Sequence, residues 1–254
     1  MVIVDRRRSN VERQASNVEQ PAAPKPRRSS TSEGGREPFI FIGHFALGFA
    51  ARRWTPRVSL GALFGAAQLA DMLWPVLVGL GIEQVRIDPG NTAMTPLDFV
   101  SYPYSHSLAA LVVWGVVFGW VCRRFVPERR VFWVIFLLVV SHWVLDVVTH
   151  RPDMPLYPGG PKLGLGLWNH PAVEKTIEIG MYAIGLWMFL GVTRARDGIG
   201  RWGLFGLAAL LFAGYIADGV PPSVTALWIT ALVLGTLTLV WSVWADRHRV
   251  LRQG

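Results

Sequence analysis

Three ionisable residues follow one another at four-residue intervals in an apolar part of the sequence. His142, Asp146 and His150 lie at the end of an apolar run that begins near Val131. On an α-helix, residues four apart lie on the same face, so these side chains would line one side of it. Imidazole and carboxylate groups are the ligands that zinc and similar metals accept in proteins. The spacing therefore predicts a metal-type site on this helix.

The composition places this helix in a membrane. Of the 254 residues, 52% are hydrophobic and only 17% are charged, whereas soluble domains carry roughly 25% charged residues. Several apolar runs approach 20 residues, the length that spans a bilayer. We therefore expect an all-α integral membrane protein, a helical bundle of about six transmembrane helices preceded by a short N-terminal apolar helix. The short helix is expected at 39–51, and the spans at 58–80, 108–125, 131–149, 172–192, 202–217 and 223–245.

The arginines predict an orientation. Four connections are rich in arginine and the alternate ones are poor in Lys and Arg, so the positive-inside rule places the basic set, and the C-terminus, in the cytoplasm. Residues 1–38 are polar and basic with little apolar periodicity, and we expect a disordered, solvated tail without a specific nucleic-acid partner. The basic connections are 52–57, 123–130, 194–201 and 247–252.

With this topology, six ionisable residues fall in the outer half or at the outer ends of their helices. Carboxylates and imidazoles at one depth would bind a divalent cation, and a further carboxylate, Glu178 or Glu174, would serve as general base. A structural interpretation stays open, because buried polar residues also join helices and cap their ends. The six residues are Asp71, His106, His142, Asp146, His150 and Glu178.

Short motifs in a fixed order resemble a known family. The sequence is similar to the YdjM-like bacterial inner-membrane proteins over roughly residues 39–180. Those proteins are described, from such motifs, as membrane-bound metal-dependent hydrolases. The motifs are Gly43-His44, Leu69-Ala70-Asp71 followed by Pro75, Ser105-His106-Ser107, and Ser141-His142 followed by Asp146.

The resemblance implies a ligand set, a reaction and a location. The site would hold zinc or manganese near the outer face of the bacterial cytoplasmic membrane and hydrolyse a lipid-like ester or a phosphoester, with membrane lipids as its surroundings. The sequence departs from the family pattern at Leu73 and Trp74, where the family has Asp and His, and at Ser101, near the place of a His. Fewer ligands imply one metal instead of two, or lost catalysis. The implied ligands are His44, Asp71, His106, His142 and Asp146.

Two other functions remain open from the sequence. A small transporter or permease would use buried Asp and His residues to relay protons or bind a cation, and a membrane scaffold would use them only for packing. The sequence sets no oligomeric state. We expect four parts: the tail at 1–38, a core with the polar site at 39–193, a transmembrane hairpin at 194–246 and a basic tail at 247–254.

Overall fold

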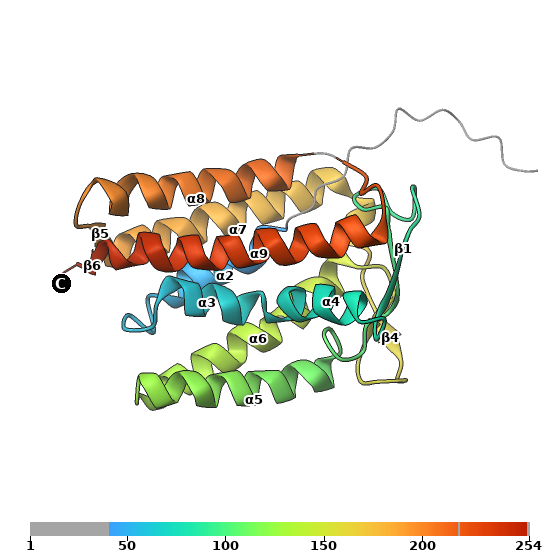
Figure 1. The fold of residues 1–254 in the computed structure, drawn as a ribbon, viewed down its shortest axis with the longest axis horizontal. Helices are drawn as coiled ribbons and strands as arrows, with labels where there is room; N and C mark the ends of the chain where they lie inside the picture. The colour runs from blue at the N-terminus through green and yellow to red at the C-terminus, as the bar shows by residue number, and fades with distance from the viewer. Residues whose placement is uncertain (1–40, 218, 253–254) are drawn as a thin grey trace, which may run out of the picture. The chain divides into compact units, whose positions relative to one another are not determined.

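The computed structural model describes residues 41–217 and 219–252, which belong to one compact unit; the tail predicted at 1–38 lies outside the described residues. The described part is a bundle of helices with three short two-stranded sheets (Figure 1). The helices are α2 (Gly43–Ala51), α3 (Leu60–Ala67), α4 (Leu69–Gly79), α5 (Leu108–Phe125), α6 (Arg129–Thr149), η1 (Leu167–Asn169), α7 (Pro171–Val192), α8 (Gly198–Ile216) and α9 (Val224–Arg247). The strands are β1 (Gln84–Ile87), β2 (Leu97–Ser101), β3 (Met154–Pro155), β4 (Lys162–Leu163), β5 (Thr193–Ala195) and β6 (Arg249–Leu251).

Five of the described helices, α5 to α9, are long and apolar enough to cross a membrane. The α3–α4 pair makes a sixth span if it is counted as one, although its two helices are bent by 60°. The predicted all-α membrane bundle is therefore confirmed. The stretch 58–80, predicted as a single span, is two helices that meet at Gln68.

The short helix α2 lies inside the bundle. It packs against α3, α6 and α7, and most of its residues are buried. Its approach to α7 is so close that a Cβ atom on Gly185 would lie 2.3 Å from the carbonyl oxygen of Ala46. At about 1.5 Å per residue, α2 is too short to cross a bilayer and begins within the bundle. Its first residues are thereby brought to the interior.

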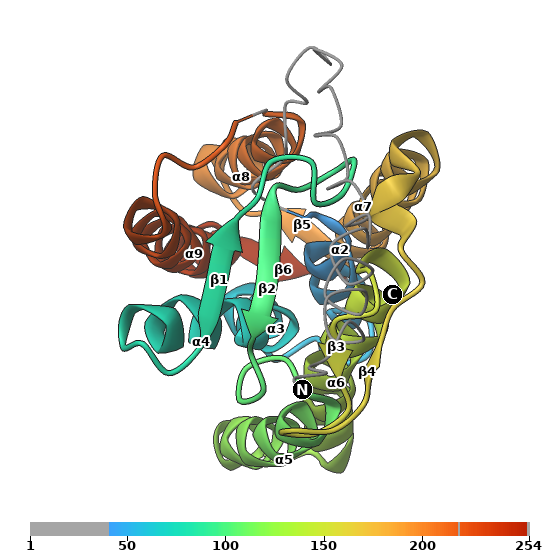
Figure 2. The same cartoon turned by 90° about the vertical axis from the view of Figure 1, so that its right-hand side faces the viewer.

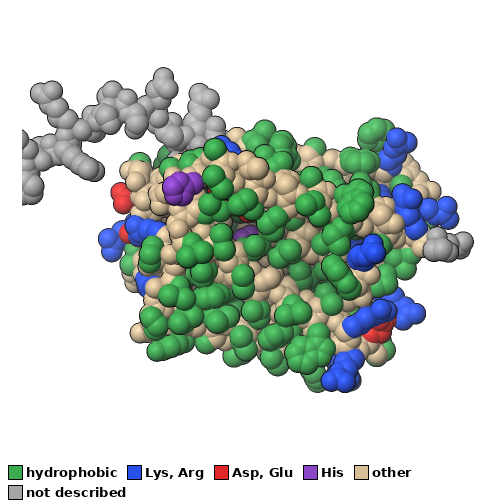
Figure 3. Space-filling view, turned by 180° about the vertical axis from the view of Figure 1, so that it is seen from behind, with side chains coloured by type: hydrophobic (Ala, Val, Ile, Leu, Met, Phe, Trp, Pro, Cys, Tyr) green, Lys and Arg blue, Asp and Glu red, His purple; other side chains and the backbone are tan. Residues whose placement is uncertain are grey.

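The four basic connections meet at one end of the bundle. Arg57, before α3, pairs with Glu128 between α5 and α6 at 2.7 Å. Arg52, after α2, pairs with Asp246 at the end of α9 at 3.0 Å, and β5 pairs with β6. Figure 3 shows most Lys and Arg of the visible face gathered at this end, with hydrophobic side chains across the middle. The alternation of basic loops predicted from the sequence is present in three dimensions.

Short strands cover the opposite end. The antiparallel β1–β2 pair lies across the ends of the helices, as seen in Figure 2. The connection between α6 and α7 contains the β3–β4 pair and η1. Arg151 holds the two connections together, since its guanidinium contacts the side chains of Asn91 and Asp98. Both segments were expected to be loops, and the strands give them a fixed position over the bundle.

The α8–α9 hairpin packs into the bundle along α3 and α4. A Cβ atom on Gly61 would lie 2.2 Å from Cγ2 of Val243, so α3 and α9 are in close contact. The α4 helix packs along α9 as well, and Gly235 lies against Met72. The hairpin is therefore a structural neighbour of the segment that carries Asp71.

A buried ion pair fixes the end of α9, and its loss should destabilise the protein. Asp246 Oδ2 accepts hydrogen bonds from Arg52 Nη1 and from the backbone N–H of Leu60, both at 3.0 Å. Removing one partner of a buried pair costs about 3–5 kcal/mol, because the other charge stays buried. We expect Asp246→Ala to lower the free energy of unfolding by about that amount, measured by SDS titration from detergent micelles.

The control is Glu128→Ala, which removes the partner of Arg57. The Arg57 side chain is 73% exposed, and exposed pairs contribute about 0–1 kcal/mol. Equal losses of stability in the two variants would contradict the assigned role of the buried pair.

Candidate metal centre

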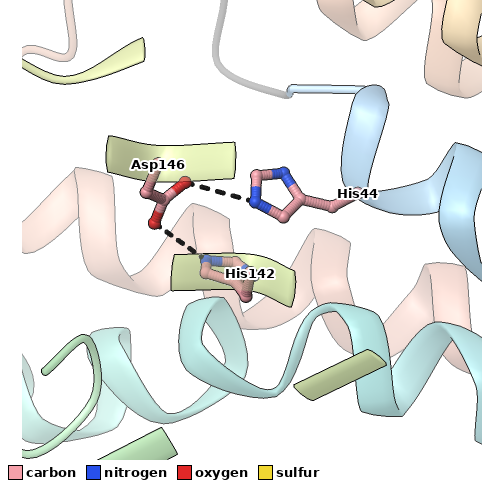
Figure 4. Close-up of side chains that lie close together, drawn as sticks. All are labelled: His44, His142 and Asp146. Atoms are coloured by element: carbon pink, nitrogen blue, oxygen red, sulfur yellow. Dashed lines mark ion pairs between the residues drawn. The ribbon is translucent and has the colours of Figure 1, made fainter. Parts of the chain in front are cut away.

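The Asp146 carboxylate lies between two imidazole rings. His142 and Asp146 occupy the last two turns of α6, and His44 is the second residue of α2. His44 Nε2 lies 3.2 Å from Asp146 Oδ1, and His142 Nε2 lies 3.2 Å from Oδ2 of the same carboxylate (Figure 4). The three side chains are buried. The helix spacing seen in the sequence thus forms a compact group with a third residue from another helix.

A second group shares His142 with the first. Asp71 Oδ1 lies 3.3 Å from His106 Nε2 and 3.6 Å from His142 Nε2. His106 Nε2 also lies 3.9 Å from Asp146 Oδ2. The His106 ring is buried, whereas the side chain of Asp71 is 49% exposed. Five of the six predicted ligands are therefore brought together, and Asp71 is the one that forms the open side.

Local structure explains how these side chains reach one place. The bend at Gln68 starts α4 anew, which sets Asp71 in the first turn of α4 facing α6. The N-cap of α5 is Ser107, whose side chain accepts a hydrogen bond from the N–H of Ala110, so His106 lies directly before the helix. Helix ends leave backbone groups unpaired, which favours polar side chains at such positions.

Nδ1 of His142, the ring nitrogen that points away from the carboxylates, is bound to a backbone carbonyl. His142 Nδ1 lies 2.8 Å from the carbonyl oxygen of Ala67, at the end of α3. A carbonyl can only accept, so Nδ1 carries the proton and donates it. In the neutral imidazole Nε2 is then a bare lone pair that faces the carboxylates. This is the arrangement in which a histidine binds a metal.

His106 is oriented in the same way through a serine. Ser105 Oγ donates to Glu83 Oε2 at 2.6 Å and lies 2.7 Å from His106 Nδ1. Glu83 also accepts from the backbone N–H groups of Tyr104 and Ser105. The serine proton is directed to Glu83, so the serine oxygen accepts a hydrogen bond from His106 Nδ1. In the neutral imidazole, Nε2 is then the unprotonated nitrogen, and it faces Asp71. Two of the three imidazoles thus have their tautomer set from outside.

The distances in the group fit a small divalent cation. Bonds from zinc to nitrogen or oxygen are about 2.0–2.2 Å, so neighbouring ligand atoms of a tetrahedral ion lie about 3.4 Å apart. The Nε2 and carboxylate oxygen atoms lie 3.2 to 3.9 Å apart. Nε2 of His44 and Nε2 of His142 are buried and form no hydrogen bond with acceptable geometry. Imidazole nitrogens and carboxylate oxygens that converge at these distances suit a cation.

The shared histidine limits the site to one cation through His142. The two groups that could hold an ion are His44, His142 and Asp146, and Asp71, His106 and His142. His142 offers only Nε2, since Nδ1 is bound to the Ala67 carbonyl. This agrees with the sequence, in which the family positions for two further ligands hold Leu73 and Trp74.

The structure places His150 beside this group, not in it. His150 is the C-cap of α6, with an extended backbone (φ −67°, ψ 152°), so the helical spacing ends one residue earlier. Its Nδ1 lies 3.0 Å from Asp153 Oδ1, and its ring lies against Trp168. Burial raises the pKa of the Asp153 carboxyl, but hydrogen bonds from His150, Tyr102 and Arg151 outweigh this and hold the pKa below its usual value. The role of His150 as a ligand stays a prediction.

The two glutamates of α7 lie behind the start of α2. Glu178 Oε2 accepts the backbone N–H of Gly43 at 2.6 Å, directly before His44. Glu174 Oε2 accepts the hydroxyl of Tyr215 at 2.8 Å. Both glutamates are buried. The geometry gives Glu178 a positioning contact with the helix that carries His44, and the general-base role of either glutamate stays a prediction.

Three contributors to the site were not found from the sequence. Glu83 lies in a connection, 22 residues before Ser105, and no spacing pattern marks it. The Ala67 carbonyl becomes an acceptor through the bend, and a backbone group has no sequence signature. Gln68, at the bend, is buried, and its Oε1 has no hydrogen-bond partner among the described residues. A polar residue within an apolar run was the available signal for Gln68.

The serine that orients His106 gives a test of the site. We expect Ser105→Ala to weaken zinc binding about 10- to 100-fold, the usual effect of removing a partner that orients a metal-bound histidine. The affinity is measured by zinc titration of the metal-free protein in detergent. The control is Ser107→Ala, which removes a helix cap and about 1 kcal/mol of stability but leaves the imidazoles in place. Equal zinc affinity in wild type and Ser105→Ala would refute the orientation argument.

Comparison with known proteins identifies the family. Residues 40–248 match the family described as YdjM inner membrane protein. No curated protein and no solved structure matches the chain. The match includes the four segments that carry the His and Asp side chains of the centre, and it continues through the α8–α9 hairpin. With its membrane-spanning helices and this match over most of its length, the chain belongs to the YdjM inner membrane protein family and is a multi-pass inner-membrane protein.

Proposed function

We propose that the protein is a metal-dependent hydrolase whose divalent cation, zinc or manganese, is bound by the centre described above. The observation that supports this most is the convergence of three imidazole Nε2 atoms and two carboxylates at 3.2 to 3.9 Å in a largely buried group. The proposed ligands are His44, Asp71, His106, His142 and Asp146.

The chemistry follows from the charges and openings of the site. A divalent cation bound by histidine and carboxylate lowers the pKa of a bound water from 15.7 to about 7. The two carboxylates offset the charge of such a cation, while the buried rings of His44 and His142 exclude bulk water from one side. Asp71, half exposed, borders the side from which water and substrate arrive. Its free carboxylate oxygen can accept a hydrogen bond there and orient a reacting water.

We also propose an orientation in the membrane. The connections with the most arginines lie at the end of the bundle away from the centre, and such loops face the cytoplasm. His142 and Asp146 lie roughly 10 Å and 5 Å from the other end of α6, at about 1.5 Å per residue. The centre would then lie in the outer half of the membrane, with the C-terminus in the cytoplasm.

Metal content is the first property to measure. We expect near-stoichiometric zinc or manganese in the wild-type protein purified in detergent, and almost none in Asp146→Ala, because this change removes a carboxylate that faces three imidazoles. Elemental analysis gives both numbers. The control is Asp197→Ala, an exposed aspartate that caps α8 at the basic end and should leave the metal content unchanged.

The other outcomes separate the rival functions. No metal in the wild type after growth in metal-rich medium would refute the hydrolase proposal. Transport would then be favoured if the wild type carries protons or cations into vesicles and Asp71→Asn abolishes this uptake. A scaffold would be favoured if Asp71→Asn and His142→Ala lower only the stability of the protein.

A further inference from the structure

A cavity of about 170 Å³ lies directly against the centre. His44, Asp71, His106 and Asp146 all border it, so any molecule that fills the cavity meets the proposed ligands. Engineered apolar cavities of about 150 Å³ hold a benzene molecule. The cavity can therefore take an apolar group of roughly six carbons beside the reacting atoms.

Away from the centre, most of the cavity wall is apolar. Aromatic and aliphatic side chains from α2, α4, β2, η1 and α9 surround it, and its described lining contains no Lys or Arg. Among the wall residues are Phe45, Trp74, Phe99, Trp168, Leu227 and Leu239.

The charges of the site favour an uncharged substrate. Asp71 and Asp146 together balance one divalent cation, so no positive charge remains for an anionic substrate. Arg86 and Arg151 lie at the same end of the bundle but do not line the cavity, and Arg151 is already paired with Asp98 and Asp153. Phosphate groups in proteins are normally met by Arg or Lys, and a buried charge without a partner is costly.

The cavity reaches the surface at α9, on the side of this helix that faces α8. Thr230 and Leu234 of α9 border it and are themselves exposed, as is Asp71 of α4. The next residues on the outer side of α9, Val233 and Leu237, are exposed and apolar. A substrate can therefore come from the bilayer without crossing a polar surface.

We infer that the substrate is a membrane-soluble carboxylic ester whose compact apolar group occupies this cavity; the inference rests on the proposed hydrolase function. In the reaction, a water oxygen forms a bond to the carbonyl carbon and the bond from that carbon to the alkoxy oxygen breaks. One water proton goes to the leaving alkoxide, and the products are an alcohol and a carboxylic acid.

The test compares esters with phosphoesters on the zinc-loaded, full-length protein in lipid nanodiscs. The substrates are p-nitrophenyl acetate, butyrate and hexanoate, p-nitrophenyl phosphate and bis(p-nitrophenyl) phosphate. We expect kcat/KM to rise about fourfold for each methylene that enters the cavity, with phosphoester hydrolysis no faster than in the metal-free protein. Preferred hydrolysis of a phosphoester would overturn the ester inference and leave the hydrolase proposal intact. No hydrolysis of any substrate by the metal-loaded protein would overturn both.

Variants of α9 test the cavity itself. Ala231 and Thr230 border it, whereas Thr236, on the same helix and exposed, does not. We expect Ala231→Phe and Thr230→Phe to reduce the hexanoate-to-acetate ratio of kcat/KM about 10-fold or more at unchanged zinc content. Thr236→Phe, the matched control, should keep the wild-type ratio.

A binding measurement that needs no metal accompanies the kinetics. Trp74 and Trp168 border the cavity, so 6-bromohexan-1-ol should quench the tryptophan fluorescence of the metal-free protein. In Ala231→Phe and Thr230→Phe, quenching should need about 10-fold more alcohol. A flat chain-length profile in the wild type, or the same quenching in all three variants, would overturn the assignment of the cavity.

Discussion

The burial of the Asp146 carboxylate among imidazole rings is the constraint that shapes this protein. Moving a carboxylate from water into a protein interior costs several kcal/mol, and the cost is offset only by well-placed partners. Asp146 is 5% exposed and faces His44, His142 and His106. Because these rings turn their Nε2 atoms towards it, the carboxylate is compensated only when protons or a cation lie between them. Stability and the proposed chemistry therefore depend on the same few atoms.

Irregular features of the fold supply the partners. The 60° bend between α3 and α4 ends one helix at Ala67, whose carbonyl then holds His142, and starts the next so that Asp71 faces His106 and His142. The short α2 begins inside the bundle, where Glu178 accepts the N–H of Gly43. A Cβ atom on Gly43 would lie 2.5 Å from Glu178 Oε1, so a larger residue there would displace the Glu178 carboxylate. Breaks in helices and buried helix ends are costly in lipid unless polar groups satisfy them, and here the site satisfies them.

The sequence was sufficient for the parts of the site that follow from helix geometry and short motifs. The four-residue spacing correctly placed His142 and Asp146 on one face of α6. The same spacing extended to His150 assumed one more residue of helix than exists, because the chain turns to an extended conformation after Thr149. The bend at Gln68 and the contact of Glu83 with Ser105 depend on tertiary packing, which no local pattern encodes. The helices could therefore be predicted from the sequence, but the hydrogen bonds that Ala67 and Ser105 make with the imidazole rings could not.

The position of the C-terminal hairpin decides whether the centre is a closed polar cluster or a site with access. The sequence predicts a transmembrane hairpin at 194–246 that follows the core, and the family match extends from residue 40 to residue 248. In the structure α9 forms one wall of the cavity, while the proposed ligands come from α2, α4, α6 and the segment before α5. The contact of Gly61 with Val243 and the hydrogen bond from Leu60 to Asp246 hold α9 against α3. The α9 helix packs along α4, and its residues Thr230 and Leu234 border the cavity and are exposed. The hairpin thus gives the buried His and Asp side chains a path to the bilayer, which is the property that a hydrolase of membrane-soluble esters requires.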